Sequence, residues 1–298
     1  MISTGSTEQR TWRYFGIWTL ASAGLFARPL YELFRLALQD DTSSHILLIP
    51  IISAWLLYSE RPVHEILRAS VRWPAAAFIV ASALAALFSW NCTSCTARDH
   101  LSAYVLSLIL LMTGGFVLIF GSARAKASSF ALSFLLLAVP IPEVPLDKLI
   151  YCLQVGSAHV AAVFFDLSGA PVLRDGLVFH LPNLSIEVAQ ECSGIRSSLA
   201  LLILALLVAH FSFRSFWKKL LFIAAGLLMM LIKNGIRITT LTLLASYVDP
   251  GFLYGRLHRE GGVVFFLISL ALLLPLYWAL RKGEEKSAVT GDSMLSPG

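Results

Sequence analysis

Apolar runs long enough to cross a lipid bilayer recur along this chain from residue 14 to residue 280. A straight spanning helix needs roughly 20 consecutive apolar residues, and here only short polar stretches separate one such run from the next. The composition agrees, because 57% of the residues are hydrophobic and 14% are charged, against about 25% charged in a soluble domain. The chain is therefore predicted to be an all-α polytopic membrane protein. This excludes a cytosolic enzyme, a disordered scaffold and a small secreted protein built on disulfides.

We predict about eight transmembrane helices in one domain that covers residues 14–282. Residues 1–13 are expected to form a cytoplasmic tail, and the polar residues 283–298 a disordered cytoplasmic tail. A further apolar stretch, residues 146–167, is interrupted by polar side chains and is expected to lie as a helix in the membrane interface. The predicted spans are residues 14–38, 45–59, 74–90, 101–120, 128–141, 193–211, 217–247 and 262–280.

The distribution of basic residues predicts the orientation of these spans. If the N-terminus is cytoplasmic and residues 146–167 do not cross, thirteen Lys and Arg residues lie on the cytoplasmic side and five on the outer side, as the positive-inside rule requires. If residues 146–167 did cross, every later loop would change side and the basic loop 214–219 would face outward. Eight crossings with both ends inside is thus the better prediction. The net charge of the chain is +5. Its basic residues are spread over the loops and do not form a patch typical of nucleic-acid binding.

Two local patterns fall in the predicted outer loops. Residues 176–188 alternate apolar and polar side chains around Pro182-Asn183, which predicts a small extracytoplasmic β-hairpin. Cys92 and Cys95 form a CxxC pair in another loop. A zinc site would need two more ligands, for which only Asp99 and His100 lie nearby, so a local disulfide or no special role are the alternatives to a metal.

Three chemically capable side chains fall at the outer ends of three consecutive spans. Cys192 opens the sixth span, Arg237 lies near the outer end of the seventh, and His258 precedes the eighth. These spans run inward, outward and inward again, so the three side chains can meet at one depth. Together they can break an amide through a thioester: the thiolate attacks the carbonyl, the imidazole moves protons, and the guanidinium stabilises the oxyanion. The helix N-terminus and Arg196, one turn further on, both favour an ionised thiol.

Each of these residues also has an ordinary structural interpretation. A cysteine in a membrane helix is usually a small inert side chain, and His258 has three charged neighbours that are typical of a solvated loop. Arg237 is different, because a charge inside a span is costly and is a functional candidate by default. Lys233 shares its helix face, so a purely structural polar cluster remains an alternative. The combination of three candidates favours the catalytic interpretation.

The blocks that carry these residues resemble a known family. CSGIRS (192–197), NGIRI (234–238) and HREGGVVFF (258–266) resemble the three signature blocks of the exosortase/archaeosortase family, whose members are integral-membrane cysteine transpeptidases. The segments 42–62, 135–154 and 169–194 are similar to other parts of that family, so the resemblance extends over most of residues 15–280.

The resemblance implies a fold, a reaction and a set of site residues. Cys192 would form the acyl-thioester, Arg237 would be the essential arginine, often described as the proton donor, and His258 would stabilise the transition state or act as base. Archaeal relatives carry an arginine in place of His258, so the resemblance points to the bacterial branch and to a multi-pass protein of the bacterial inner membrane. One departure is that the family often reads VAEAC where this chain has VAQEC, and no catalytic role is assigned to Glu191.

The substrates implied are exported proteins whose C-terminal sorting signal, of the PEP-CTERM type, is cleaved and transferred to a surface acceptor. Arg196, Asn234 and His45, which follows Ser44 at the outer start of the second span, are predicted to bind substrate. The chemistry requires no cofactor and no metal. Two rival functions remain open: a cysteine protease with water as the acceptor, and a non-catalytic transporter or scaffold in polysaccharide export.

Overall fold

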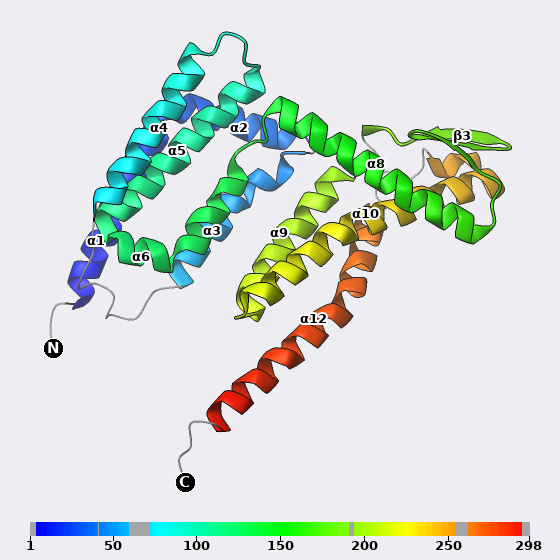
Figure 1. The fold of residues 1–298 in the computed structure, drawn as a ribbon. Helices are drawn as coiled ribbons and strands as arrows, with labels where there is room; N and C mark the ends of the chain where they lie inside the picture. The colour runs from blue at the N-terminus through cyan, green and yellow to red at the C-terminus, as the bar shows by residue number, and fades with distance from the viewer. Residues whose placement is uncertain (1–3, 41, 60–71, 191–193, 254–261, 294–298) are drawn as a thin grey trace. The chain divides into compact units, whose positions relative to one another are not determined.

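A computed structural model of the chain describes all residues except 1–3, 41, 60–71, 191–193, 254–261 and 294–298. The described chain forms two compact units, Met1–Leu146 and Asp147–Gly298, each with its own core. Nearly all of its regular structure is helical, which confirms the predicted helical membrane fold (Figure 1). Six of the described helices are long and apolar enough to cross a membrane: Trp73–Asn91, Ala97–Phe120, Glu143–Ser168, Ile195–Ser212, Phe216–Tyr247 and Gly262–Glu284.

The first unit is built around an antiparallel pair of long helices. Ser82 on one helix and Ser107 on the other exchange hydrogen bonds with each other's backbone carbonyls, at 2.7 and 2.8 Å. Gly115 lets the Trp18 ring lie against the second helix, since a Cβ at this position would come within 2.1 Å of the indole nitrogen. The elements of this unit are α1 (Thr4–Leu25), α2 (Ala27–Gln39), η1 (Ser44–Leu47), α3 (Ile49–Ser59), α4 (Trp73–Asn91), α5 (Ala97–Phe120), α6 (Ser122–Ala127), α7 (Ser129–Phe134) and η3 (Leu135–Ala138).

Three predicted spans of this unit are interrupted. The prediction of one helix over residues 14–38 is wrong, because the helix is interrupted at Phe26, between α1 and α2. Pro29 explains the break, since proline has no N–H to donate to the carbonyl four residues earlier. The predicted span 45–59 begins with the 3₁₀ turn η1, and the predicted span 128–141 is only α7 and η3. Helix η3 ends at Ala138, and the extended backbone of Val139 that follows is typical of a residue before proline.

The second unit packs a helix and a small sheet against two long helices. Its elements are α8 (Glu143–Ser168), which starts at the end of the first unit, then β1 (Leu173–Asp175), β2 (Val178–Leu181), β3 (Leu184–Glu187), α9 (Ile195–Ser212), α10 (Phe216–Tyr247), η5 (Pro250–Leu253) and α12 (Gly262–Ser293). The predicted hairpin is present, because β2 and β3 pair around Pro182-Asn183. The short strand β1, which the sequence did not indicate, extends the hairpin to a three-stranded antiparallel sheet.

Buried side chains of α8, the sheet and α10 form one apolar core. Phe165 of α8 and Phe179 of β2 are almost fully buried, with their ring centroids 5.1 Å apart, and Ile238 of α10 belongs to the same core. Gln154 of α8 donates a hydrogen bond to the carbonyl of Val188 at 2.7 Å. The sheet is therefore anchored through α8.

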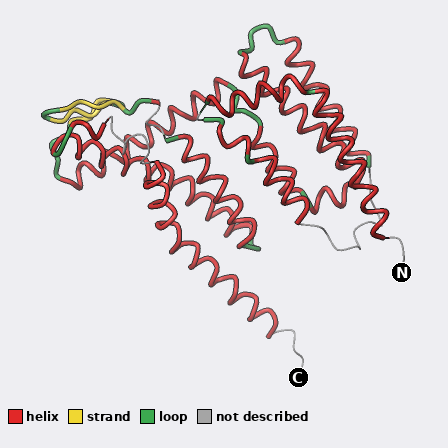
Figure 2. The backbone as a smooth tube through the Cα atoms, turned by 180° about the vertical axis from the view of Figure 1, so that it is seen from behind, coloured by secondary structure: helices red, strands yellow, loops and turns green. Residues whose placement is uncertain are grey.

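Helix α8 covers the stretch that was predicted to lie in the interface. It runs across the direction of α9 and α12 in both views of the fold (Figures 1 and 2). Its length and composition would also permit a crossing, so the interfacial placement stays a prediction. At the other end of the unit, α12 continues to Ser293, and most of the tail predicted to be disordered is therefore helical.

Candidate active site

The first signature block begins with a glycine turn. Cys192 lies outside the described residues, which resume at Gly194, two residues later. Gly194 is the N-cap of α9 and has a left-handed backbone with φ of 68°, a conformation that glycine adopts without the cost a Cβ would bring. Ser197, in the first turn of α9, donates a hydrogen bond to the Gly194 carbonyl at 3.1 Å. The start of α9 at Gly194 is thus held in one defined turn.

The second signature block on α10 packs directly against this turn. A Cβ on Gly194 would lie 2.7 Å from Oδ1 of Asn234, so the two blocks touch at van der Waals distance. Nζ of Lys233 donates to Oγ of Ser197 at 2.5 Å. Lys233 is 2% exposed and Asn234 is 1% exposed. A buried lysine requires a polar partner, and here it has one in the first turn of α9.

Helix α8 supports α10 from another side. Nδ2 of Asn234 donates to Oγ of Ser157 at 3.0 Å, and Thr239 donates to the carbonyl of Ala161 at 3.3 Å. Gly235 permits this approach, because a Cβ there would overlap Val160 at 2.5 Å. The Asn-Gly pair of the second block is therefore held between α8 and the start of α9.

Of the other predicted site residues, the structure describes Arg237 and Arg196 but not His258. Arg237 lies one turn after Lys233 on α10 and is half-buried, and Arg196 is exposed on α9. His258 lies outside the described residues, which resume at Gly262 with α12. That helix packs against both α9 and α10 through a cluster of Leu201, Met230 and Leu273. The third block therefore leads into a helix that contacts the two helices carrying the first and second blocks.

Two contacts in this region were missed from the sequence. Lys233 was seen only as a neighbour of Arg237 on its helix face, and Ser197 and Ser157 were not singled out. Ser197 lies 36 residues from Lys233 and Ser157 lies 77 residues from Asn234. A single sequence offers no periodic signal for pairs that are so far apart.

His45 belongs to the first unit, where it lies beside a polar cluster built on Arg98. Arg98 donates from Nη1 to Oδ2 of Asp40 at 2.9 Å and from Nη2 to the hydroxyls of Thr42 and Ser43 at 3.1 and 3.0 Å. Nε of Arg98 donates to the carbonyl of Ile141 at 2.9 Å. One guanidinium thus joins the segment before η1, the start of α5 and the segment before α8.

The charge of Asp40 is stabilised by this cluster. Its partial burial alone would raise the pKa of the carboxyl, but hydrogen bonds from Thr42, Arg98 and Ser43 together hold the pKa below the ordinary value of 3.8. His45 is half-buried beside the cluster, in polar contact with the backbone of Leu137 and Thr42. Its role in substrate binding stays a prediction.

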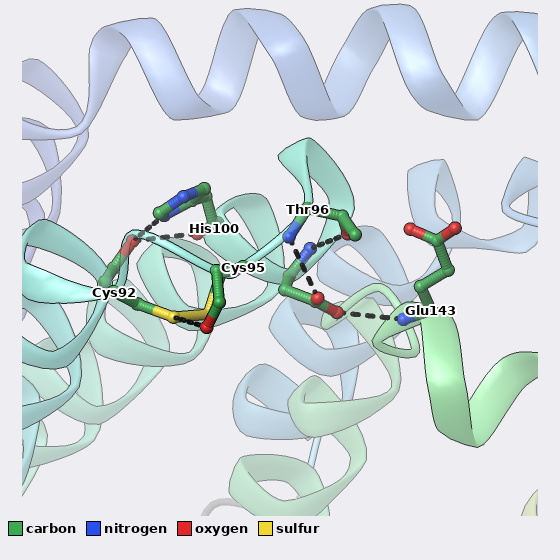
Figure 3. Close-up of a disulfide and its surroundings, with 8 residues drawn as sticks. Cys92, Cys95, Thr96, His100 and Glu143 are labelled. Atoms are coloured by element: carbon green, nitrogen blue, oxygen red, sulfur yellow. Dashed lines mark hydrogen bonds between the residues drawn. A yellow bond between two sulfur atoms is a disulfide. The ribbon is translucent and has the colours of Figure 1, made fainter.

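The CxxC pair forms a disulfide between Cys92 and Cys95 (Figure 3). The two residues that could have completed a metal site have other partners. His100 bonds through Nδ1 to Oγ of Ser89 at 3.1 Å, and Asp99 forms a capping box with Thr96. Within the described ranges, no cluster of three His, Cys, Asp or Glu side chains could hold a metal ion. Of the alternatives left by the sequence, the local disulfide is the one found.

Comparison with known proteins identifies the family. A model of the family described as transmembrane exosortase (Exosortase_EpsH) matches residues 37–275. All three signature blocks lie within this match. Neither a curated protein nor a solved structure matches the chain. The family match covers most of the length, including the glycine turn before α9 and the Lys-Asn-Gly segment of α10 that packs on it. The chain therefore belongs to the transmembrane exosortase family.

Proposed function

We propose that this protein is a membrane cysteine transpeptidase that cleaves C-terminal sorting signals of exported proteins, with Cys192 as the nucleophile. Family membership supports a transpeptidase or protease role in the membrane. The observation that carries the assignment to these residues is the contact between Gly194 and Asn234. It brings Gly194, two residues after Cys192 in the chain, against the helix that carries Arg237.

The first step would form a thioester. The imidazole of His258 accepts the thiol proton, and Sγ of Cys192 bonds to the carbonyl carbon of the scissile peptide. The resulting oxyanion is stabilised by the guanidinium of Arg237, which suits this role because it stays protonated. When the C–N bond breaks, the imidazolium returns its proton to the leaving amine.

The second step would release the cleaved protein. An acceptor amine attacks the thioester carbonyl, His258 takes the proton of that amine, and the thiolate of Cys192 leaves. Water in place of the amine gives plain hydrolysis. The two outcomes differ in the new C-terminus of the substrate, which carries an added group only after transfer.

The contacts around Gly194 are proposed to keep the nucleophile in place. A thiol at a helix N-terminus gains from the partial positive charge of the helix, provided that the turn before the helix keeps its shape. The hydrogen bond from Lys233 to Ser197 and that from Asn234 to Ser157 hold this turn against α10 and α10 against α8. Arg196 and His45 are proposed to contact the substrate, whereas Asn234, which is 1% exposed, would act on substrate binding through the turn at Gly194.

The test is processing of a co-expressed substrate with an exported domain, a short sorting motif, a spanning helix and a basic C-terminal end. Cys192→Ala is expected to abolish both processing and a hydroxylamine-sensitive adduct, and Arg237→Ala and His258→Ala are expected to slow both. Cys152, an exposed free thiol on α8, supplies the matched control, because Cys152→Ala should leave processing unchanged. Undiminished processing by Cys192→Ala would overturn the proposal and favour the scaffold function.

A further inference from the structure

An apolar groove of about 410 Å³ lies in the second unit, among α9, α10 and α12. These three helices pack against one another. Every residue along the groove is apolar except Ser212 and Tyr277 at one end. The lining is Leu201, Leu204, Ala205, Val208 and Ser212 of α9, Phe222 of α10, and Leu270, Leu273, Leu274 and Tyr277 of α12.

The length of the groove limits what can occupy it. From Leu201 to Ser212, α9 rises by about 16 Å at 1.5 Å per residue. A bilayer has a hydrocarbon core about 30 Å thick, so the groove extends over one leaflet. An apolar helix that spans the bilayer would need a surface about twice as long. A lipid acyl chain, which occupies a single leaflet, fits this length.

The polar end of the groove carries positive charge. Arg281 donates from Nη1 to the hydroxyl of Tyr277 at 3.0 Å, which places a guanidinium at the end of the lining. Lys218, at the start of α10, forms an ion pair with Glu284 at 3.5 Å, so the excess positive charge comes from Arg281 and the other basic residues of this end. Six basic residues against two acidic ones occur in the two chain segments at this end, residues 213–219 and 281–286.

Exposed aromatic side chains place this end at the membrane surface. Trp217 is 73% exposed and Trp278 is 61% exposed, beside Lys218 and Tyr277 in the chain. Tryptophan is enriched at the level of lipid headgroups, where its ring is apolar and its N–H reaches water. The basic residues therefore lie at the depth of a lipid phosphate, on the side that the charge distribution predicts to be cytoplasmic.

We propose that this groove is a binding site for an anionic phospholipid, with one acyl chain between α9 and α12 and the phosphate against Arg281. Basic sites between transmembrane helices on the cytoplasmic side are typical of anionic lipid recognition. The lipid fills the gap that α9 and α12 leave over α10 and stabilises their packing. The site uses none of the residues assigned to the thioester chemistry.

The test measures retained lipid by native mass spectrometry, after the full chain in detergent is mixed with phosphatidylglycerol and phosphatidylcholine in equal amounts. The wild type is expected to retain phosphatidylglycerol preferentially. Arg281→Gln should lower this retention about fivefold, the effect of one cation near an anionic headgroup, and lower retention of phosphatidylcholine less, because its choline cation offsets the phosphate charge. The matched control is Arg28→Gln, because Arg28 is also a helical arginine and its side chain is 89% exposed.

A second variant tests the acyl-chain half of the site. Val208→Phe adds bulk to the groove and is expected to lower retention of both lipids, whereas Leu206→Phe adds the same type of side chain to α9 away from the lining. Equal retention of the two lipids by the wild type would overturn the proposal. Retention of phosphatidylglycerol by Arg281→Gln at the level of Arg28→Gln would overturn it too. Capture of a protein segment in place of lipid by a photo-crosslinker at position 208 would also refute it.

Discussion

The contact between Gly194 and Asn234 allows one substitution to be analysed in detail. Gly194→Ala puts a Cβ on a residue with φ of 68°, which costs about 1–2 kcal/mol for an L-residue in the left-handed region. The same Cβ would lie 2.7 Å from Oδ1 and 3.1 Å from Cγ of Asn234. Either the start of α9 or the Asn234 side chain must then move.

The Asn234 amide cannot move without a further cost. It is 1% exposed, and its Nδ2 donates to Ser157. Loss of that hydrogen bond would cost about 1 kcal/mol. We therefore expect Gly194→Ala to lower the free energy of unfolding by about 2–3 kcal/mol in total, from the backbone term and the lost hydrogen bond together.

A matched control separates the backbone term from the overlap. Gly176 has φ of 59°, similar to that of Gly194, and a Cβ there would meet no atom within 4 Å. Gly176→Ala should therefore cost only the backbone term, about 1–2 kcal/mol. The difference between the two variants, measured by reversible denaturation in mixed micelles, reports the contact with Asn234 alone.

Processing of a co-expressed substrate is the second assay. If the turn at Gly194 positions Cys192, Gly194→Ala should slow processing by at least about tenfold, the factor that corresponds to 1.4 kcal/mol. Gly176→Ala should leave the rate within about twofold of the wild type, because the sheet is not part of the proposed chemistry. Adding Asn234→Ala to Gly194→Ala removes the overlapping atom and should restore part of the lost stability. Equal losses of stability and activity in the two glycine variants would refute the positioning argument.

Three further outcomes follow from the Lys233–Ser197 hydrogen bond, the Asp40–Arg98 pair and the disulfide. Lys233→Met removes the charged donor to Ser197 and is expected to slow processing about tenfold, since hydrogen bonds to charged groups contribute about 1.5–3 kcal/mol. Unchanged processing in the co-expression assay would contradict a role of this hydrogen bond. The lowered pKa of Asp40 means that its carboxylate stabilises the fold above pH 3.8, and that this contribution is lost as the pH falls through the lowered pKa. Asp40→Asn should therefore be less stable than the wild type at pH 6, with the gap closing in strong acid, and a gap of the same size at both pH values would show that the pair with Arg98 is not the cause. Cys95→Ser should expose one thiol to a membrane-impermeant maleimide without reductant, whereas labelling of the unreduced wild type at this loop would argue against the disulfide.

Much of the helical framework could be predicted from the sequence. The runs that became α4, α5, α9, α10 and α12 were recognised because a helix in lipid must satisfy its own backbone hydrogen bonds over roughly 20 apolar residues. The hairpin was recognised for an equally local reason, the alternation of residues on both sides of a two-residue turn. The interruption of the helix at Phe26 also has a local cause in Pro29, but the apolar pattern alone does not indicate it.

For the candidate site, the sequence predicts the reacting residues, and the tertiary structure shows which side chains pack at the start of α9 and on α10. Its chemistry was predicted from residue types at the ends of three spans, and its family from three short blocks, neither of which requires coordinates. The sequence by itself thus determined the class of protein, the membrane-spanning runs and the residues proposed to react. The tertiary structure alone decided that Lys233 pairs with Ser197, that Asn234 lies against Gly194, and that Arg98 joins three segments of the first unit. The physical reason is that these contacts join residues tens of positions apart, and their partners depend on how the helices pack.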